Sequence, residues 1–346
     1  MAADQAGAFL TDPFSRRRAW GLPLLALAVV GAAVATLAFG AVDVPFSEVA
    51  AVLARRVGLR WFGEPTDQAM AVVWNIRMPR LLLGVTVGAG LAATGAALQG
   101  LLRNDLADPH LLGIGPGAAV GAAIGAGAGG IPGAIAAGVA AGVGTAFVLR
   151  RFRRRLSIDP TRLILSGVAL GAALSAWVGF VVTASDRSVV PPIEFWLLGS
   201  LSGATWRAAG TTMVIVAAGL AVLFGMRRIL DLLVTGDLQA RHLGVDVELV
   251  STVLLVVVGA VVGATVGAVG VVAFVGLLVP FMIRRLVGPR HGHLLAGAIV
   301  AGAGLMVGSD LLARLSLEPV EIPVGLVTSA IGGPVFLWLL SRRRDV

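Results

Sequence analysis

The chain has 346 residues, of which 57% are hydrophobic and 13% are charged, and its mean hydropathy is +0.93. This composition is too apolar for a water-facing globular surface and predicts a protein whose main solvent is lipid. All 27 residues in the Lys+Arg count are Arg and there is no Cys, which excludes a lysine-dependent phosphate-binding loop, a Schiff-base lysine, a thiolate nucleophile and a cysteine metal site.

The N-terminal part begins with a short polar segment, residues 1–20, that contains three consecutive arginines. An apolar run follows from Gly21 to Gly40. It is longer than the usual core of a signal peptide and is followed by a poor cleavage site, so it is predicted to be a retained span. Residues 43–77 are mixed and polar, and we expect them to form the first large external loop.

Apolar runs continue through the rest of the chain, each near the roughly 20 residues that a helix needs to cross a membrane. They are continuously apolar, without the two-residue alternation of membrane strands, so helices are expected rather than a barrel. The sequence therefore predicts an all-α, polytopic membrane protein with one domain over residues 1–346 and ten transmembrane helices. The ten runs are 21–40, 79–101, 111–128, 131–149, 163–184, 207–226, 249–269, 271–287, 293–313 and 323–341.

The arginines are distributed unevenly between the two sides of this predicted topology. If the N-terminus is cytoplasmic, 19 arginines fall on the cytoplasmic side and 8 on the outer side. An excess of positive charge marks cytoplasmic loops, so both termini are predicted to be cytoplasmic. The same rule explains the net charge of +8 without a nucleic-acid partner, and none is expected.

Two glycine stripes predict close contacts between helices. Glycines recur every four residues from Gly113 to Gly129, and again from Gly259 to Gly267. Without Cβ atoms, such a stripe lets two backbones approach closely. We expect these stripes to serve helix packing rather than direct contact with a substrate.

Several short motifs follow one another along the chain. In sequence order they are RMPRL at 77–81, GAALQG at 95–100, RNDLADP at 103–109, FWLLGSL at 195–201, GDLQARHLG at 236–244, FVGLLVP at 274–280, PVG at 323–325 and GGP at 332–334. Together they resemble the FecCD-type permease family, the membrane subunits of type II ATP-binding-cassette importers for iron-siderophores, haem or cobalamin. The resemblance covers nearly the whole chain, and is greatest for haem importer permeases.

The resemblance implies a type II importer permease architecture in the bacterial inner membrane. It implies a homodimer with the substrate path between the two copies, two ATPase subunits that hold ATP and Mg, and a periplasmic substrate-binding protein. The chain itself would be non-catalytic and would bind no cofactor, and it would contact membrane lipid and its substrate, haem or a related iron chelate.

The turn at 103–109 is where the family places its cytoplasmic gate, and the resemblance assigns the gate to Asn104 and Leu106. An amide that pairs across a two-fold axis and an apolar side chain that excludes water suit a constriction. The alternative is an ordinary helix-capping turn. The family usually has Pro where this chain has Asp105, which puts the rigidity of the turn in question.

The loop at about 229–248 is where the family places the coupling helix that docks on the ATPase. Its glycine-bracketed stretch alternates apolar and polar side chains, which also suits a helix lying on the lipid surface. The residues assigned to coupling are Gly236, Asp237, Leu238, Ala240, Arg241, His242, Leu243 and Gly244.

Arginines on the predicted outer side are candidates for docking the binding protein, because charge-assisted pairs at an exposed rim set orientation and association rate. They are Arg55, Arg56, Arg60 and Arg314. The alternatives are a solvated loop for the first three and, for Arg314, a pair with Asp310 one helical turn away.

Candidate substrate-path residues on the outer half are Trp177, Arg187, Phe195 and Trp196, although interfacial anchoring explains the aromatic residues equally well. Haem is the expected substrate, with a ferric siderophore or cobalamin as alternatives. An alternative of another class is an ion-coupled secondary transporter, which would need an acidic or histidine residue deep in a span. The acidic residues here fall in loops or near span ends, which disfavours it.

Overall fold

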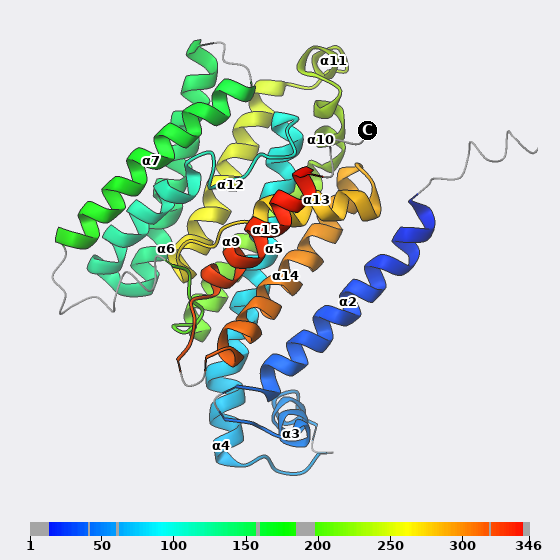
Figure 1. The fold of residues 1–346 in the computed structure, drawn as a ribbon, viewed down its shortest axis with the longest axis vertical. Coiled ribbons are helices and arrows are strands. Elements are labelled where there is room, and N and C mark those ends of the chain that lie inside the picture. The colour runs from blue at the N-terminus through cyan, green and yellow to red at the C-terminus, as the bar shows by residue number, and fades with distance from the viewer. Residues whose placement is uncertain are drawn as a thin grey trace, which may run out of the picture.

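The computed structural model describes residues 14–40, 42–59, 62–156, 160–184, 198–317 and 320–341. Within these ranges every regular element is a helix (Figure 1). The elements are α2 (Ser15–Ala38), α3 (Phe46–Arg56), α4 (Asp67–Ala69), the π-helix η1 (Met70–Arg77), α5 (Met78–Leu102), α6 (Ile114–Leu156), α7 (Pro160–Ala184), α9 (Trp206–Gly225), α10 (Arg227–Val234), α11 (Asp237–His242), α12 (Val247–Val269), α13 (Val275–Val287), α14 (His291–Leu315) and α15 (Val324–Ser341).

The long element α6 consists of two helices joined at a kink. Its backbone leaves the helical region at Gly129 (φ −153°) and at Gly130 (φ +60°), where only glycine is free of strain. The carbonyl of Gly133 lies against Gly125 across the kink, so the two arms fold back on each other as a hairpin. The two apolar runs predicted at 111–128 and 131–149 correspond to these arms.

Each of the ten predicted runs coincides with a helix, but the count of ten membrane crossings is not confirmed. Seven helical stretches among the described residues are long and apolar enough to cross a membrane, counting the kinked α6 as one. The helix α13 has only 13 residues, because residues 271–274 at the start of the run predicted at 271–287 are not helical. α15 contains a shorter apolar stretch, Val324–Trp338.

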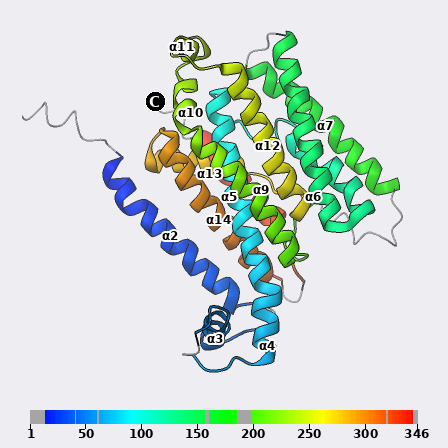
Figure 2. The same ribbon diagram turned by 180° about the vertical axis from the view of Figure 1, so that it is seen from behind.

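The helix α5 forms the centre of the bundle. Almost all of its side chains are buried, and it contacts α9, α12, α13 and α14. Both views place α6 and α7 on one flank of α5 and α2 on the opposite flank (Figure 1, Figure 2). Because its surroundings are apolar all round, α5 needs no polar face, which explains why nearly every residue from Leu81 to Leu102 is small or aliphatic.

The glycine stripes make the close contacts that the sequence predicts. Gly259 lies against Gly142 on the second arm of α6, where an added Cβ would stand 2.7 Å from the Gly142 carbonyl oxygen. Gly267 is packed in the same way against Ile135, with 2.5 Å between an added Cβ and the Ile135 Cα. In the earlier stripe, Gly117, Gly121 and Gly125 face the second arm of α6, whereas Gly129 lies at the kink, where an added Cβ would meet nothing within 4 Å.

The two ends of the bundle carry different elements. α2 begins, and α15 ends, at the end that carries α10 and α11, while α3 and α4 lie at the opposite end (Figure 1). The predicted external loop and the predicted coupling segment are therefore on opposite sides of the bundle. We call these the α3 end and the α11 end.

Candidate functional site

The turn that follows α5 lies at the α11 end. The Asn104 side-chain oxygen accepts a hydrogen bond from the Leu106 backbone N–H at 2.8 Å, and the Asn104 carbonyl accepts one from the Ala107 N–H at 3.1 Å. Asp108 then caps the next turn by accepting from the His110 N–H at 2.7 Å. Asn104 and Leu106 are both half-buried, so the pair sits at the surface of this subunit.

The residue that departs from the family pattern, Asp105, occupies a position that suits proline. The hydrogen bond between Asn104 and Ala107 makes Asp105 the second residue of a four-residue turn, where proline is favoured because of its fixed φ. Asp105 instead forms an ion pair with Arg284 of α13, and the Arg284 Nη2 also donates to Gln99 Oε1 of α5 at 2.9 Å. The turn is thus closed by a backbone hydrogen bond and is linked to α13 by the Asp105–Arg284 ion pair.

The predicted coupling stretch is a helix, α11, bracketed by glycines as expected. Gly236 precedes it with φ +121° and Gly244 follows it with φ +84°, conformations that other residues rarely adopt. Ala240 is fully buried against the bundle, whereas Leu238 and Leu243 are 66% and 63% exposed. The helix and its C-cap residue Leu243 therefore present two large apolar side chains outward, together with the exposed Arg241 and His242.

The helix α11 and the turn after α5 are in direct contact. Arg103 Nη2 lies 3.3 Å from Asp237 Oδ1, and the same guanidinium lies beside Gly236. The two segments that the sequence marks as functional are 134 residues apart when counted from Arg103 to Asp237, and the fold brings them together. They form one site at the α11 end.

At the α3 end, two of the predicted docking arginines are exposed. Arg55 lies 3.6 Å from Glu64, and Arg56 stacks over the Trp74 ring at 4.5 Å from its centroid. Trp74 in turn packs against Trp206 with ring centroids 4.8 Å apart. The third arginine of this loop, Arg60, lies outside the described residues.

The fourth predicted docking residue, Arg314, does not lie on an exposed rim. It is 7% exposed, and its guanidinium donates to the carbonyls of Thr36 and Phe39, both at 3.2 Å. It also pairs with Asp310 at 3.3 Å, which is the alternative that the sequence offered. The guanidinium is therefore committed to contacts within the chain, because α2 ends directly over it.

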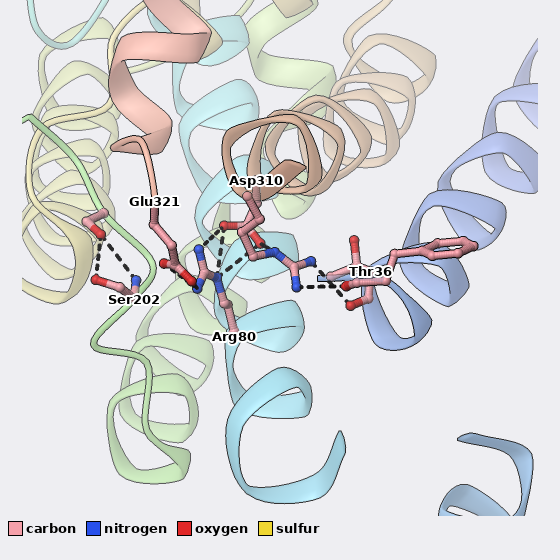
Figure 3. Close-up of polar contacts among 8 residues, drawn as sticks. Thr36, Arg80, Ser202, Asp310 and Glu321 are labelled. Atoms are coloured by element: carbon pink, nitrogen blue, oxygen red, sulfur yellow. Dashed lines mark hydrogen bonds and ion pairs between the residues drawn. The ribbon is translucent and has the colours of Figure 1, made fainter. Parts of the chain in front are cut away.

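Asp310 belongs to a buried ionic cluster that links three parts of the chain (Figure 3). Arg80 of α5 donates to both oxygens of Asp310 at 2.9–3.1 Å, and also to Glu321 in the loop before α15 at 2.9 Å. Because Asp310 is 2% exposed, its charge is stable only with partners such as these. Asp310 therefore differs from a carboxylate that binds a coupling ion, because its oxygens are already paired with arginine.

Of the candidate path residues, the structure describes only Trp177. It is 59% exposed on α7 and meets Phe180 edge to face at 5.6 Å between ring centroids. Arg187, Phe195 and Trp196 lie outside the described residues.

Sequence reasoning missed three charged residues, Arg80, Arg284 and Asp231, and it gave Asp310 only Arg314 as a partner. Arg80 and Asp310 stood inside apolar runs, and a charge in a span is itself a signal that a buried partner exists. Arg284 gave no signal beyond lying next to Arg285 near the end of a predicted apolar run. Asp231 of α10 was also missed, and it accepts a hydrogen bond from the His291 backbone N–H at 2.8 Å and contacts the His291 Nδ1 at 2.7 Å.

Comparison with known proteins identifies the family of this chain. The FecCD transport family matches residues 25–342. The cobalamin import system permease protein BtuC of Halobacterium salinarum is 38% identical over 82% of this chain and 76% of its own length. The hemin transport system permease protein HmuU of Yersinia pestis is 37% identical over 81% of this chain and 86% of its own.

Solved structures agree with the sequence relatives. A metal-chelate type ABC transporter in an inward-facing conformation has a TM-score of 0.79 at 30% identity, and the match covers 93% of this chain and 98% of that one. The streptococcal PsaBC protein, at 18% identity and a TM-score of 0.55, shares the fold. The helical bundle and these matches define a multi-pass membrane permease of the ATP-binding-cassette importer class. Within that class, the chain belongs to the FecCD transport family.

Proposed function

We propose that this permease forms a homodimer in the bacterial inner membrane and imports haem by alternating access, powered by two separate ATPase subunits. The observation that carries the proposal is the contact between the turn after α5 and α11, because an importer needs its gate and its ATPase contact to be linked. A binding protein delivers the substrate at the α3 end, which makes that end periplasmic. Both termini are then cytoplasmic.

The gate is assigned to Asn104 and Leu106. Both side chains lie at the surface of the single subunit, which leaves them available to a second copy. Leu106 would close the path by apolar contact with its symmetry mate, and Asn104 would pair by its amide.

The ATPase contact is assigned to the exposed residues of α11. Leu238 and Leu243 expose apolar area beside two basic side chains, a combination that suits a protein groove with acidic edges. Replacing Arg241 and Leu243 together with Asp would place unpaired carboxylates in that groove. We expect the ATPase to be lost on purification while the helical fold persists; unchanged co-purification and unchanged transport would refute this assignment.

Haem is supported by the hemin permease relative, and the distribution of histidines fits the passage of an intact chelate. The chain has four histidines and no Tyr, and all four lie at the α11 end: His110 after the turn, His242 in α11, and His291 and His293 at the start of α14. No imidazole or phenolate is therefore available to ligate iron near the α3 end, so an intact chelate passes without being captured. Arg55 and Arg56 remain the docking candidates of the described part of the chain.

The test is uptake into vesicles that contain this permease, its ATPase and the binding protein encoded beside it. We expect ATP-dependent accumulation of haem. Accumulation of cobalamin or of a ferric siderophore without haem would overturn the substrate and leave the importer intact. Uptake that requires an ion gradient and no ATP would overturn the importer itself.

A further inference from the structure

Two ion pairs link the turn after α5 to neighbouring helices. Arg103 pairs with Asp237 of α11 at 3.3 Å, and Asp105 pairs with Arg284 of α13. Asn104 lies between Arg103 and Asp105, the two residues of the turn that form these ion pairs, and Leu106 follows Asp105. The short segment assigned to the gate is thus connected to two different helices by two separate ion pairs.

Arg103 occupies a backbone position that normally favours glycine. It caps the C-terminus of α5 with φ +49°, and it is one of two non-glycine residues with positive φ among those the structure describes. Glycine is the usual residue there because it has no Cβ to strain. An arginine at this position gives up that advantage, and what its side chain supplies is the contact with Asp237 and Gly236.

The neighbours of α11 and of the gate turn are held by contacts of their own. α10 is held to α14, because Asp231 accepts from the His291 N–H at 2.8 Å and contacts its ring at 2.7 Å. Between α10 and α11 stands Gly236, whose φ of +121° makes it a natural pivot. Arg284 is held in place from the other side by Gln99, which also donates to the Leu277 carbonyl at 3.2 Å.

We infer that the Arg103–Asp237 ion pair transmits movement of α11 to the gate turn, while Asp105–Arg284 holds the far side of the turn against α13. The inference rests on the proposed function, in which α11 contacts the ATPase and the turn is the gate. When α11 pivots at Gly236, the pair draws Arg103 with it. The displacement then falls on Asn104, because Asp105 stays with α13, and it reaches Leu106 through the hydrogen bond that the Leu106 N–H donates to the Asn104 side-chain oxygen at 2.8 Å.

The experiment uses the absence of cysteine from the natural chain. A single Leu106→Cys reporter is introduced, and the complex with its ATPase subunits is placed in lipid nanodiscs. The rate of maleimide labelling is measured with and without ATP plus vanadate. Three further variants carry Arg103→Asp, Asp237→Arg, or both substitutions in the reporter background, and co-purification of the ATPase is recorded for each.

We expect nucleotide to change the labelling rate of the reporter protein. Each single reversal should reduce that change about fivefold, the ratio that corresponds to about 1 kcal/mol for a partly exposed ion pair. The double reversal should restore it, because the charges again attract. Arg103→Asp is the more informative single variant, since its side chain belongs to the turn and not to the ATPase contact.

Two results would overturn the inference while the proposed function stands. In the first, the single reversals keep the full nucleotide effect. In the second, they lose it and the double reversal does not recover it, which would mean that each residue acts alone. Loss of the ATPase from the reporter protein itself, or no nucleotide effect in it, would overturn the proposed function and the inference with it.

Discussion

The crossing of α5 and α14 allows a prediction whose size follows from the structure. Gly88 and Gly302 face each other there with their backbones in contact. A Cβ added to Gly302 would stand 2.6 Å from the Ala92 Cβ and 2.9 Å from the Gly88 carbonyl carbon, closer than real Cβ atoms approach. The Gly88 atoms belong to the backbone and the Ala92 Cβ is fixed to it, so relief requires a shift of a whole helix. We therefore expect Gly302→Ala to destabilise the protein by about 3 kcal/mol, the upper end of the usual range for overpacking.

Gly308, six residues further along the same helix, is the matched control. An added Cβ there meets nothing within 4 Å. Alanine in a helix interior is favoured over glycine by about 0.5–1 kcal/mol, so Gly308→Ala should be neutral or slightly stabilising. Thermal unfolding of the purified variants in one detergent, followed by helical circular dichroism and by size-exclusion profile, measures the difference. Equal stability of the two variants, or a less stable Gly308→Ala, would refute the packing argument.

Three further predictions concern the charged residues and the topology. Asp105→Ala should raise basal ATP turnover and vesicle leak about two- to fivefold, because it removes a partly exposed ion pair. Asp105→Pro should leave both near the parent values, because the turn position accepts proline. Equal leak in the two variants would contradict this account. Arg80→Gln should destabilise the protein by about 3 kcal/mol, because it leaves the buried Asp310 carboxylate poorly compensated. Arg55→Gln, at an exposed ion pair, should change stability by less than about 1 kcal/mol. Similar losses of stability in the two variants would show that burial does not decide how much an ion pair contributes. A cysteine in place of Gly58 should react with an impermeant thiol reagent added from the periplasm and one in place of Thr235 should not, and the reverse pattern would invert the orientation.

The sequence predicts those features that depend on neighbouring residues or on a regular spacing. Apolar run length located the helices, and the four-residue glycine spacing identified the faces that touch, because both properties belong to a single helix. The glycines at 236 and 244 likewise bracketed α11 correctly. Where an apolar run includes non-helical residues, as at 271–274 before α13, hydropathy alone overestimated the length of the helix.

Features that depend on the packing of distant helices could not be predicted. Arg284 lies 179 residues from Asp105, and Asp310 lies 230 residues from Arg80, so neither pair has a local signature. Arg314 misled the prediction for the same reason. A cation near the end of a span is exposed or buried according to which helix ends beside it, and here the end of α2 covers it.

The reciprocal contacts between glycines also limit how this bundle can change shape. Where Gly88 meets Gly302, and where Gly142 meets Gly259, each bare position faces a backbone carbonyl of the neighbouring helix. Sliding one helix along the other by a residue would bring a side-chain-bearing Cα to that carbonyl, so shear between these helices is blocked. α5 with α14, and α12 with the second arm of α6, must then travel as rigid pairs. Opening and closing of the permease is accordingly expected to be a rotation of such pairs about hinges in the connecting segments.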